Sequence, residues 1–148
     1  MLTSKFPSLA SSLASSKVLG LYFASSWCPD CTPVTPRLKT IFESQAGNDF
    51  SVVYVSSDRS EEQMKETMEK SHGKWGMIPF DSSEKDELKK NFGCCAGSEV
   101  FQLGMSPFDR KYGIPTLVLI DCEKQEVISF DGVQDVMSGE LLAKYGLS

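Results

Sequence analysis

The sequence predicts an α/β fold, in which a central mixed β-sheet is flanked by α-helices to give three α/β/α layers. The apolar run 18–24 is followed closely by two cysteines with two residues between them, Cys28 and Cys31. A second apolar run, 117–120, is opened by Pro115 and a threonine. Strand-like and helix-like segments alternate between the two runs, and such alternation is typical of a sheet with helices on both faces.

The composition indicates a soluble globular protein with one core. The chain has 148 residues, which suits a single domain over residues 1–148. Hydrophobic residues make up 41% and charged residues 24%, both ordinary values. The net charge of -5 gives no electrostatic support for nucleic-acid binding, and no apolar stretch approaches the length of a membrane span. We therefore expect neither nucleic acid nor a membrane as a partner.

The cysteine count and the N-terminal residues indicate a reducing compartment. Five cysteines are an odd number and do not resemble a disulfide framework. Residues 1–7 lack the continuous apolar core of a secretory signal. We expect a cytoplasmic protein, with the nucleus as a second location. In such a compartment a pair of cysteines at this spacing is more often catalytic or metal-binding than structural.

The first half of the chain is expected to alternate helix and strand. Residues 1–16 favour a short helix, and the continuous apolar run 18–24 is typical of a strand buried on both faces. A helix is predicted over 28–44, kinked by Pro36, and a strand over 50–56. Four apolar residues of this predicted helix fall on one stripe at helical spacing: Val34, Leu38, Ile41 and Phe42.

Two further helices are expected in the middle of the chain. Ser60 is a favourable N-cap, and the acidic residues after it suit the first turn of a helix over 61–70. A loop over 73–81 separates this helix from another over 83–91, for which Ser83 is the expected cap.

The last third is expected to complete the sheet. Residues 93–109 have no helical or strand periodicity and are interpreted as an irregular insertion. Two strands follow, 116–121 and 126–130, joined by a tight turn. A short helix over 138–145 is expected to cover the sheet.

The pair Cys28 and Cys31 predicts thiol–disulfide chemistry. Cys28 is expected at a helix N-terminus, where unpaired N–H groups and the helix dipole favour a negative charge. The thiolate is the form that attacks a disulfide sulfur, so Cys28 is the expected nucleophile. Cys31 follows one turn later and is expected to be more deeply buried. Its role is to resolve the mixed disulfide by attacking Cys28.

Three neighbours are expected to adjust this chemistry. Pro29 fixes the backbone and removes an N–H that could face the sulfurs. Asp30 places a carboxylate close to Cys28, and the like charge disfavours the Cys28 thiolate. Trp27 is expected to shield one side of the sulfur and to offer an apolar contact to a substrate.

Pro115 is predicted to follow a cis peptide bond. Beside the dithiol, that arrangement exposes the backbone of Ile114, which can pair with an extended substrate segment. The same proline is expected to keep a competing metal ion away.

At these residues the chain resembles the thioredoxin superfamily, specifically its tryparedoxin and nucleoredoxin branch. The resemblance covers about residues 18–135. It is carried by four segments, of which the second is the most specific to the branch: 21–29, 52–62, 78–80 and 112–117. The branch has a tyrosine, here Tyr22, where ordinary thioredoxins have a buried acid, so water or another group must accept the proton of Cys31. Asp30 departs from the family, which usually has proline there.

The resemblance implies a thioredoxin fold and a protein-disulfide reductase acting in redox homeostasis or redox signalling. The expected partners are disulfide-containing proteins, redox-regulated signalling proteins, and an electron donor that is either a reductase or a small dithiol. The sequence contains no flavin or nicotinamide fingerprint, so we expect no cofactor and no bound metal.

Three alternatives stay open. A zinc site needs four ligands, and the adjacent Cys94 and Cys95 cannot easily both face one ion. A thiol peroxidase needs a proline well before a Thr/Ser-x-x-Cys motif; Ser25 fits the motif, but Leu21 occupies the proline position. A non-catalytic interaction module, or a homodimer, would use the apolar residues of 99–108: Val100, Phe101, Leu103, Met105 and Phe108.

The remaining candidate residues have plainer interpretations. Cys94 and Cys95 are expected to be loop cysteines, with a vicinal disulfide, a regulatory thiol or an intersubunit bridge as alternatives. Cys122 is expected to be an inert surface or edge residue. His72 is expected to be solvated in a polar loop, with proton transfer as the alternative. Trp75 fits loop packing and substrate contact equally well.

Overall fold

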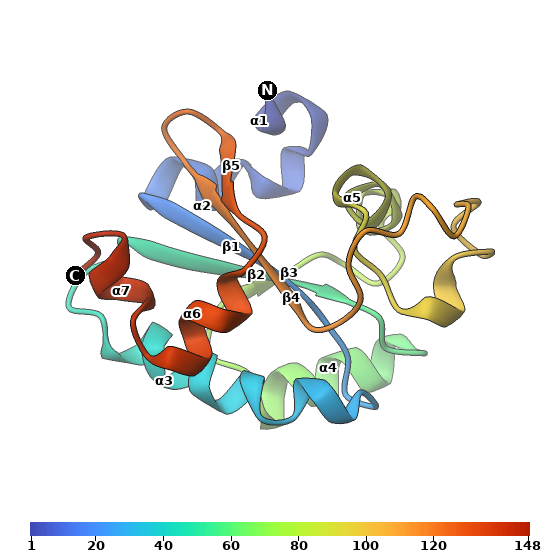
Figure 1. The fold of residues 1–148 in the computed structure, drawn as a ribbon, viewed down its shortest axis with the longest axis horizontal. Coiled ribbons are helices and arrows are strands. Elements are labelled where there is room, and N and C mark those ends of the chain that lie inside the picture. Colours follow the sequence, from blue (N-terminus) through green and yellow to red (C-terminus); the bar gives the residue numbers. More distant parts are fainter.

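The computed structural model describes residues 1–148, and its centre is a five-stranded mixed sheet with the order β3-β2-β1-β4-β5 (Figure 1). The central strand β1, Val18–Ala24, is parallel to β2, Phe50–Ser56, and antiparallel to β4, Thr116–Asp121. The edge strands are β3, Gly76–Met77, parallel to β2, and β5, Glu126–Ser129, antiparallel to β4. The predicted mixed sheet is therefore confirmed.

The burial of β1 explains its continuous apolar sequence. All seven of its residues are buried, because it has a strand on each side and helices over each face. A strand in this position has no solvent face and needs no polar alternation. The edge strand β5 is mostly exposed, in keeping with its place at the border of the sheet.

One face of the sheet is covered by four helices (Figure 1). They are α3, Val34–Ser44; α4, Glu61–Lys70; α6, Gly132–Ser138; and the short α7, Leu141–Lys144. Their apolar sides pack into one buried cluster with side chains of β1 and β2. The predicted stripe of the α3 helix lies against this cluster, with Leu38 fully buried in it.

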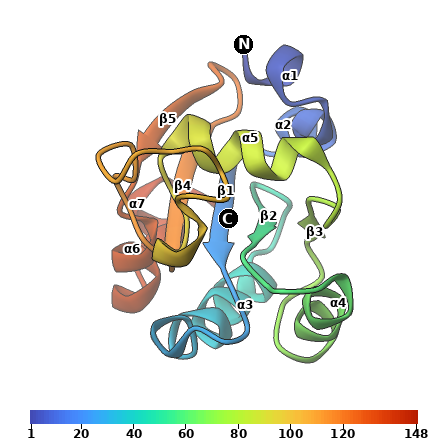
Figure 2. The same ribbon diagram turned by 90° about the vertical axis from the view of Figure 1, so that its right-hand side faces the viewer.

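The opposite face is covered by the N-terminal segment and by α5, Ser83–Phe92, which lie on the same side of the sheet in Figure 2. The N-terminal segment comprises α1, Leu2–Lys5, a 3-10 turn, Pro7–Leu9, and α2, Ala10–Ser15. These elements bury a second apolar cluster against the sheet. The three predicted layers are thus present. None of the helices is both long and apolar enough to span a bilayer.

The helix predicted over 28–44 is divided. A single 3-10 turn, Pro29–Cys31, comes first, and α3 begins only at Val34. Pro33 has no N–H to donate to the carbonyl of Pro29, so the first turn cannot continue as an α-helix. Pro36 consequently lies in the first turn of α3, where no N–H is required, and the predicted interior kink is wrong.

Three further element predictions need correction. The helix predicted over 138–145 is replaced by α6 and α7, because Gly139 takes a left-handed conformation, with φ 76°, and ends α6. The N-cap of α5 is Ser82 rather than Ser83, since the Ser82 side chain accepts a hydrogen bond from the Glu84 N–H. The loop predicted over 73–81 contains the two-residue strand β3, which is too short to leave a periodic pattern.

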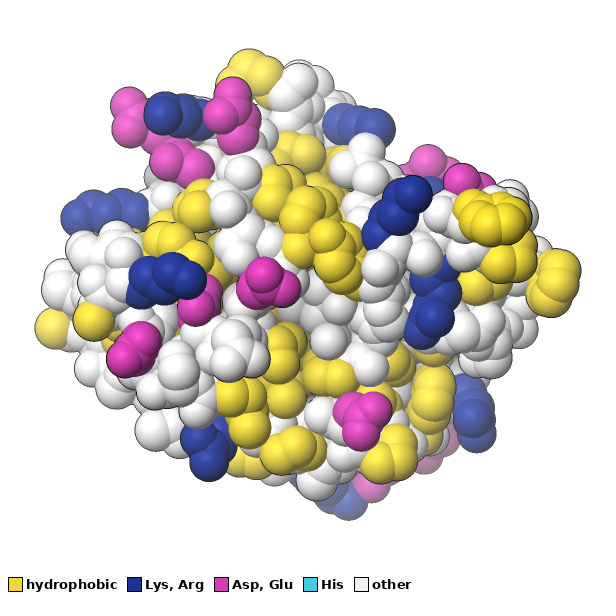
Figure 3. Space-filling model, in the orientation of Figure 1, with side chains coloured by type: hydrophobic (Ala, Val, Ile, Leu, Met, Phe, Trp, Pro, Cys, Tyr) yellow, Lys and Arg dark blue, Asp and Glu magenta, His cyan; other side chains and the backbone are white.

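The segment 93–109 is irregular, as predicted, apart from a 3-10 turn at Gly97–Glu99. It projects from the sheet at the right of Figure 1 and has a small apolar cluster of its own, formed by Cys95, Val100, Leu103 and Met105. Two aromatic side chains, Phe101 and Phe108, are 88% and 86% exposed. Hydrophobic side chains accordingly gather at this edge of the molecule in Figure 3.

Candidate active site

The two thiols lie directly after the central strand, where the chain leaves β1 for the 3-10 turn. Pro29 is the first residue of that turn, as predicted, whereas Cys28 is the N-cap of this short turn and not of the long helix expected over 28–44. The Cys31 N–H donates to the Cys28 carbonyl at 3.2 Å, which holds the two residues in one tight turn. Both thiols are free and buried, and Cys31 is the less accessible of the two.

A second segment, distant in sequence, meets the thiols. The Ile114–Pro115 peptide bond is cis, which confirms the prediction. The Cys28 thiol lies 3.8 Å from the Ile114 carbonyl oxygen and donates a weak hydrogen bond to it. Thr116, the first residue of β4, closes the turn through a 2.6 Å bond from its hydroxyl to the Gly113 carbonyl. The CxxC turn and the proline loop therefore form one site.

The environment of Cys31 keeps its thiol protonated. Burial raises the pKa of Cys31 well above its usual range, and the hydrogen bond with Cys28 adds to this effect. The Ser25 backbone N–H partly opposes the shift, because it stabilises the Cys31 thiolate. Asp30, which is exposed, contributes a smaller rise through its negative charge. Deprotonation of Cys31 therefore needs help from its surroundings.

Trp27 is fixed beside the thiols by the loop that follows β2. Its indole N–H donates to the Ser57 carbonyl at 2.9 Å. The Arg59 guanidinium lies 4.9 Å from the centre of the indole ring, within the range of a cation–π contact. The side chain stays partly exposed, which leaves an apolar surface next to Cys28.

Asp58 is a structural residue of the site that sequence reasoning missed. Its buried carboxylate accepts four hydrogen bonds of 2.7 Å: from the N–H and hydroxyl of Ser26, from the Tyr54 hydroxyl and from the Ser56 hydroxyl. Because Ser26 precedes Trp27 and Cys28, this carboxylate sets the path of the loop that carries the thiols. An acidic residue two positions after a buried strand does not by itself indicate this role, because many surface carboxylates follow strands in the same way.

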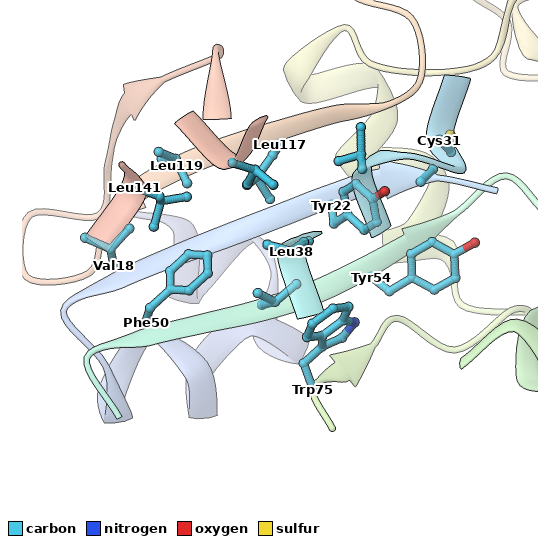
Figure 4. Close-up of a cluster of buried hydrophobic side chains, with 14 of the residues drawn as sticks. Val18, Tyr22, Cys31, Leu38, Phe50, Tyr54, Trp75, Leu117, Leu119 and Leu141 are labelled. Carbon is cyan, nitrogen blue, oxygen red and sulfur yellow. The ribbon is translucent and has the colours of Figure 1, made fainter. Parts of the chain in front are cut away.

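Tyr22 lies beneath the 3-10 turn, and Figure 4 shows its hydroxyl directed toward the end of the sheet that carries Cys31. The hydroxyl forms a buried 2.7 Å hydrogen bond with the Thr35 hydroxyl. Burial raises the pKa of Tyr22 far above its usual range, so it remains a neutral phenol. Thr35 in turn donates to the Cys31 carbonyl at 3.3 Å.

His72 is buried, which corrects the expectation of a solvated side chain. It is 5% exposed, and its ring packs against Tyr54 with centroids 4.3 Å apart. The Trp75 indole N–H donates to His72 Nδ1 at 3.1 Å. Burial lowers the pKa of His72 to about 4, so the imidazole is neutral at physiological pH. Trp75 is itself buried against Phe42, which confirms its interpretation as loop packing.

A polar cavity of about 440 Å³ opens beneath Cys31. Its wall includes Cys31, Ser25, Thr35 and His72, and most of the residues that line it are of polar types. The Ser25 hydroxyl is buried and has no hydrogen-bond partner in the protein. An unpaired buried hydroxyl is costly unless water or another ligand satisfies it, so the cavity suits ordered water next to a reacting thiol.

Glu99 connects the 93–109 segment to the site. It accepts hydrogen bonds from the Ser57 hydroxyl at 2.6 Å and from the Ala96 N–H at 2.9 Å. It also forms an ion pair of 2.5 Å with Lys89 of α5, whose side chain is only 1% exposed. Since Ser57 holds Trp27, the position of Trp27 depends on this segment.

The other three cysteines are buried. Cys94 and Cys95 are fully inaccessible and free, and burial raises the pKa of each. Cys122 is also buried, which corrects its placement at the surface, and burial raises its pKa. Cys94 and Cys95, which have no exposed surface and raised pKa values, are therefore poor nucleophiles. No three His, Cys, Asp or Glu side chains are grouped in a way that could hold a metal ion.

The sheet order, the CxxC turn after the central strand and the cis proline before β4 define a protein of the thioredoxin-fold class. Two solved structures are similar to this chain in fold. Thioredoxin from Wuchereria bancrofti is 33% identical with a TM-score of 0.70, over 93% of this chain and 85% of that chain. Tryparedoxin II from C. fasciculata is 26% identical with a TM-score of 0.68, over 91% and 78% respectively.

The chain belongs to the thioredoxin-like family, whose model matches residues 16–127. Among curated relatives, human nucleoredoxin is 31% identical over 136 residues, covering 90% of this chain and 27% of nucleoredoxin. Tryparedoxin from Trypanosoma brucei brucei is 32% identical over 116 residues, covering 76% of this chain and 66% of tryparedoxin. The chain thus spans about a quarter of the length of the nucleoredoxins it matches.

Proposed function

We propose that this chain is a dithiol–disulfide oxidoreductase that reduces disulfides in proteins through Cys28 and Cys31. The observation that carries the proposal is the contact between the Cys28 thiol and the Ile114 carbonyl. It places a thiol next to backbone that can pair with an extended peptide. Similarity to nucleoredoxin and tryparedoxin supports the same class of chemistry.

The reaction takes two steps. The Cys28 thiolate attacks one sulfur of the substrate disulfide, forms a mixed disulfide and releases the other substrate sulfur as a thiolate, which takes up a proton. Cys31 then loses its proton, attacks the Cys28 sulfur and releases the second substrate thiolate. The two thiols supply the two electrons that reduce the substrate, and they end as a Cys28–Cys31 disulfide. A donor reductase or small dithiol must reduce this disulfide again.

The neighbouring residues have distinct proposed roles. Trp27 and the Ile114–Pro115 backbone contact the substrate on either side of the Cys28 sulfur. Pro29 fixes the first position of the 3-10 turn, and Asp30 opposes the build-up of negative charge on the thiols. Tyr22 supports the turn from below through Thr35.

The setting of this activity is also a proposal. We place the chain in the cytoplasm or nucleus, where it would serve redox homeostasis or redox signalling by reducing cysteines of partner proteins. The exposed Phe101 and Phe108 lie on the segment that Glu99 links to the site.

Dithiothreitol-driven reduction of insulin tests the proposal. Wild-type protein should accelerate reduction, and Cys28→Ser should abolish the effect. Cys31→Ser should retain the first step only and accumulate a substrate joined to Cys28, visible by mass spectrometry. Cys122→Ser, at a buried thiol outside the site, is the matched control and should be fully active. Wild-type protein without activity, or activity that survives Cys28→Ser, would refute the proposal.

A further inference from the structure

The polar cavity beneath Cys31 contains two groups that the two-step reaction leaves unexplained. Ser25 lines the cavity and is 5% exposed, and its buried hydroxyl has no partner in the protein. His72 lines the same cavity although its ring is buried among Tyr22, Tyr54 and Trp75. Buried polar groups without partners are normally satisfied by ordered water.

The hydrogen bond from Trp75 fixes the protonation of His72. Because the indole N–H donates to Nδ1, that nitrogen must be the acceptor, and the proton of the neutral ring is on Nε2. The bond from Trp75 is the single side-chain hydrogen bond of His72, and Nε2 is not among the fully buried polar atoms that lack a partner, so it can reach water. His72 therefore offers a fixed N–H donor in a cavity whose wall also contains the Cys31 side chain.

We propose that His72 is a positioning residue for the second step: its Nε2–H, together with the Ser25 hydroxyl, holds a water molecule that removes the proton of Cys31. This inference rests on the proposed function and adds the proton path to it. The cavity water thus takes the role of proton acceptor that a buried carboxylate at position 22 would have. Tyr22 cannot serve as the base, because its phenol stays neutral and its hydroxyl is already bonded to Thr35.

The proton balance of the step is complete. As the cavity water takes the proton of Cys31, it releases one of its own protons to solvent, and the Cys31 thiolate attacks the Cys28 sulfur of the mixed disulfide. The S–S bond to the substrate breaks, and the departing substrate thiolate receives a proton from solvent, with which the cavity water exchanges. No oxidant or reductant beyond the substrate disulfide is required.

Other charged groups around the cavity set limits on this path. Asp58 is close enough to His72 to raise its pKa slightly, yet burial dominates. Glu66 and Lys70 of α4 also line the cavity, and they neutralise each other in a 2.6 Å ion pair. His72 is therefore a donor to water over the working pH range and not itself the proton acceptor.

The two steps can be timed separately with 5,5′-dithiobis(2-nitrobenzoate), whose coloured thiolate is released once when Cys28 attacks and again when Cys31 resolves the adduct. Two substitutions separate the two hydrogen bonds of His72. His72→Asn retains an acceptor for Trp75 but lacks the donor to the cavity, whereas His72→Gln retains a donor to the cavity. Cys28→Ser gives the background of the buried thiols.

We expect His72→Asn to leave the first release unchanged and to slow the second at least about tenfold, with its pH–rate profile moved to higher pH. His72→Gln should restore most of the second rate. Equal second-phase rates and profiles in wild type and His72→Asn would overturn the inference while leaving the proposed function intact. Absence of a second release in wild type would instead refute the proposed function. Equal slowing of both phases would indicate a merely structural role.

Discussion

The Glu99 carboxylate accepts a hydrogen bond of 2.6 Å from the Ser57 hydroxyl, and the carbonyl of the same serine holds the indole of Trp27. Ser57 is thus shared between the 93–109 segment and the loop at the thiols. Because Glu99 also pairs with the buried Lys89, the link is anchored in α5. A change in the 93–109 segment should therefore alter the position of Trp27 beside the thiols.

Glu99→Gln is expected to lower the free energy of unfolding by about 3–5 kcal/mol, because it leaves the Lys89 ammonium buried without a counter-charge. Urea unfolding measures the loss. Glu66→Gln, which breaks the exposed Glu66–Lys70 pair, is the matched control and should cost at most about 1 kcal/mol. Lys89→Met and the double variant Lys89→Met/Glu99→Gln complete a double-mutant cycle. If the double variant loses as much free energy of unfolding as the two single variants together, the two residues are not a coupled pair.

Asp58→Asn should destabilise the chain by about 2–3 kcal/mol. The amide has only one acceptor oxygen for the four donors that the carboxylate satisfies. Loss of the bonds to Ser26 should also loosen the CxxC loop and reduce disulfide reductase activity. Asp131→Asn, at an exposed position, should change neither property. Unchanged urea unfolding for Asp58→Asn would show that the carboxylate does not organise the loop.

Stability should fall as pH decreases from about 6.5 to about 4 because of His72. In the unfolded chain His72 takes up a proton near its ordinary pKa, whereas the folded chain resists protonation until about pH 4. The unfolded state thus binds more protons in this window and is favoured as the pH falls, by roughly 2–3 kcal/mol in total. Urea unfolding at several pH values should show a flatter profile for His72→Gln. Since His72 is the single histidine of the chain, parallel profiles would contradict its burial as a neutral ring.

Gly73→Ala should displace Trp75. A Cβ at position 73 would lie 2.6 Å from the indole ring, and such overlap costs about 1–3 kcal/mol. The shift should appear in tryptophan fluorescence and in urea unfolding. Gly76→Ala is the control, because a Cβ there meets no atom within 4 Å. Equal effects of the two substitutions would show that the close approach to Trp75 is unimportant.

Removal of the charge at position 30 should make the dithiol more reactive. Asp30→Asn and Asp30→Pro are expected to speed alkylation of Cys28 by iodoacetamide roughly two- to fivefold at neutral pH, through loss of a nearby negative charge. Asp131→Asn serves again as the control for a carboxylate elsewhere on the surface. A slower reaction of either Asp30 variant would indicate that the carboxylate assists the thiol instead.

The strands and the two halves of the site were predictable because each depends on local signals. The run 18–24 is apolar throughout because β1 has no solvent face. A CxxC pair with a Pro-Thr step before a later strand is typical of a thiol–disulfide site. The division of the predicted helix at residues 29–33 was not expected. Pro33 ends the first turn because it has no N–H to donate, and the spacing of the apolar residues does not reveal that loss.

The burial of His72 and Asp58 could not be read from the sequence. His72 lies in a polar stretch, and only the folding of Trp75 back over Gly73 encloses it. Asp58 follows a strand like many surface residues, and the four donors that enclose it come from three different positions. Long-range contacts of this kind have no periodicity. The sequence indicates them only through single residues such as Gly73, where a Cβ would overlap the Trp75 indole.

The burial of Cys94, Cys95 and Cys122 limits which disulfide bonds the folded chain can form. They lie in apolar clusters separate from the one that contains Cys28 and Cys31. Disulfides between these three cysteines and the dithiol are therefore excluded while the fold persists. Each cycle of oxidation and reduction then interconverts the Cys28–Cys31 dithiol and its disulfide, and the other three cysteines take no part in it.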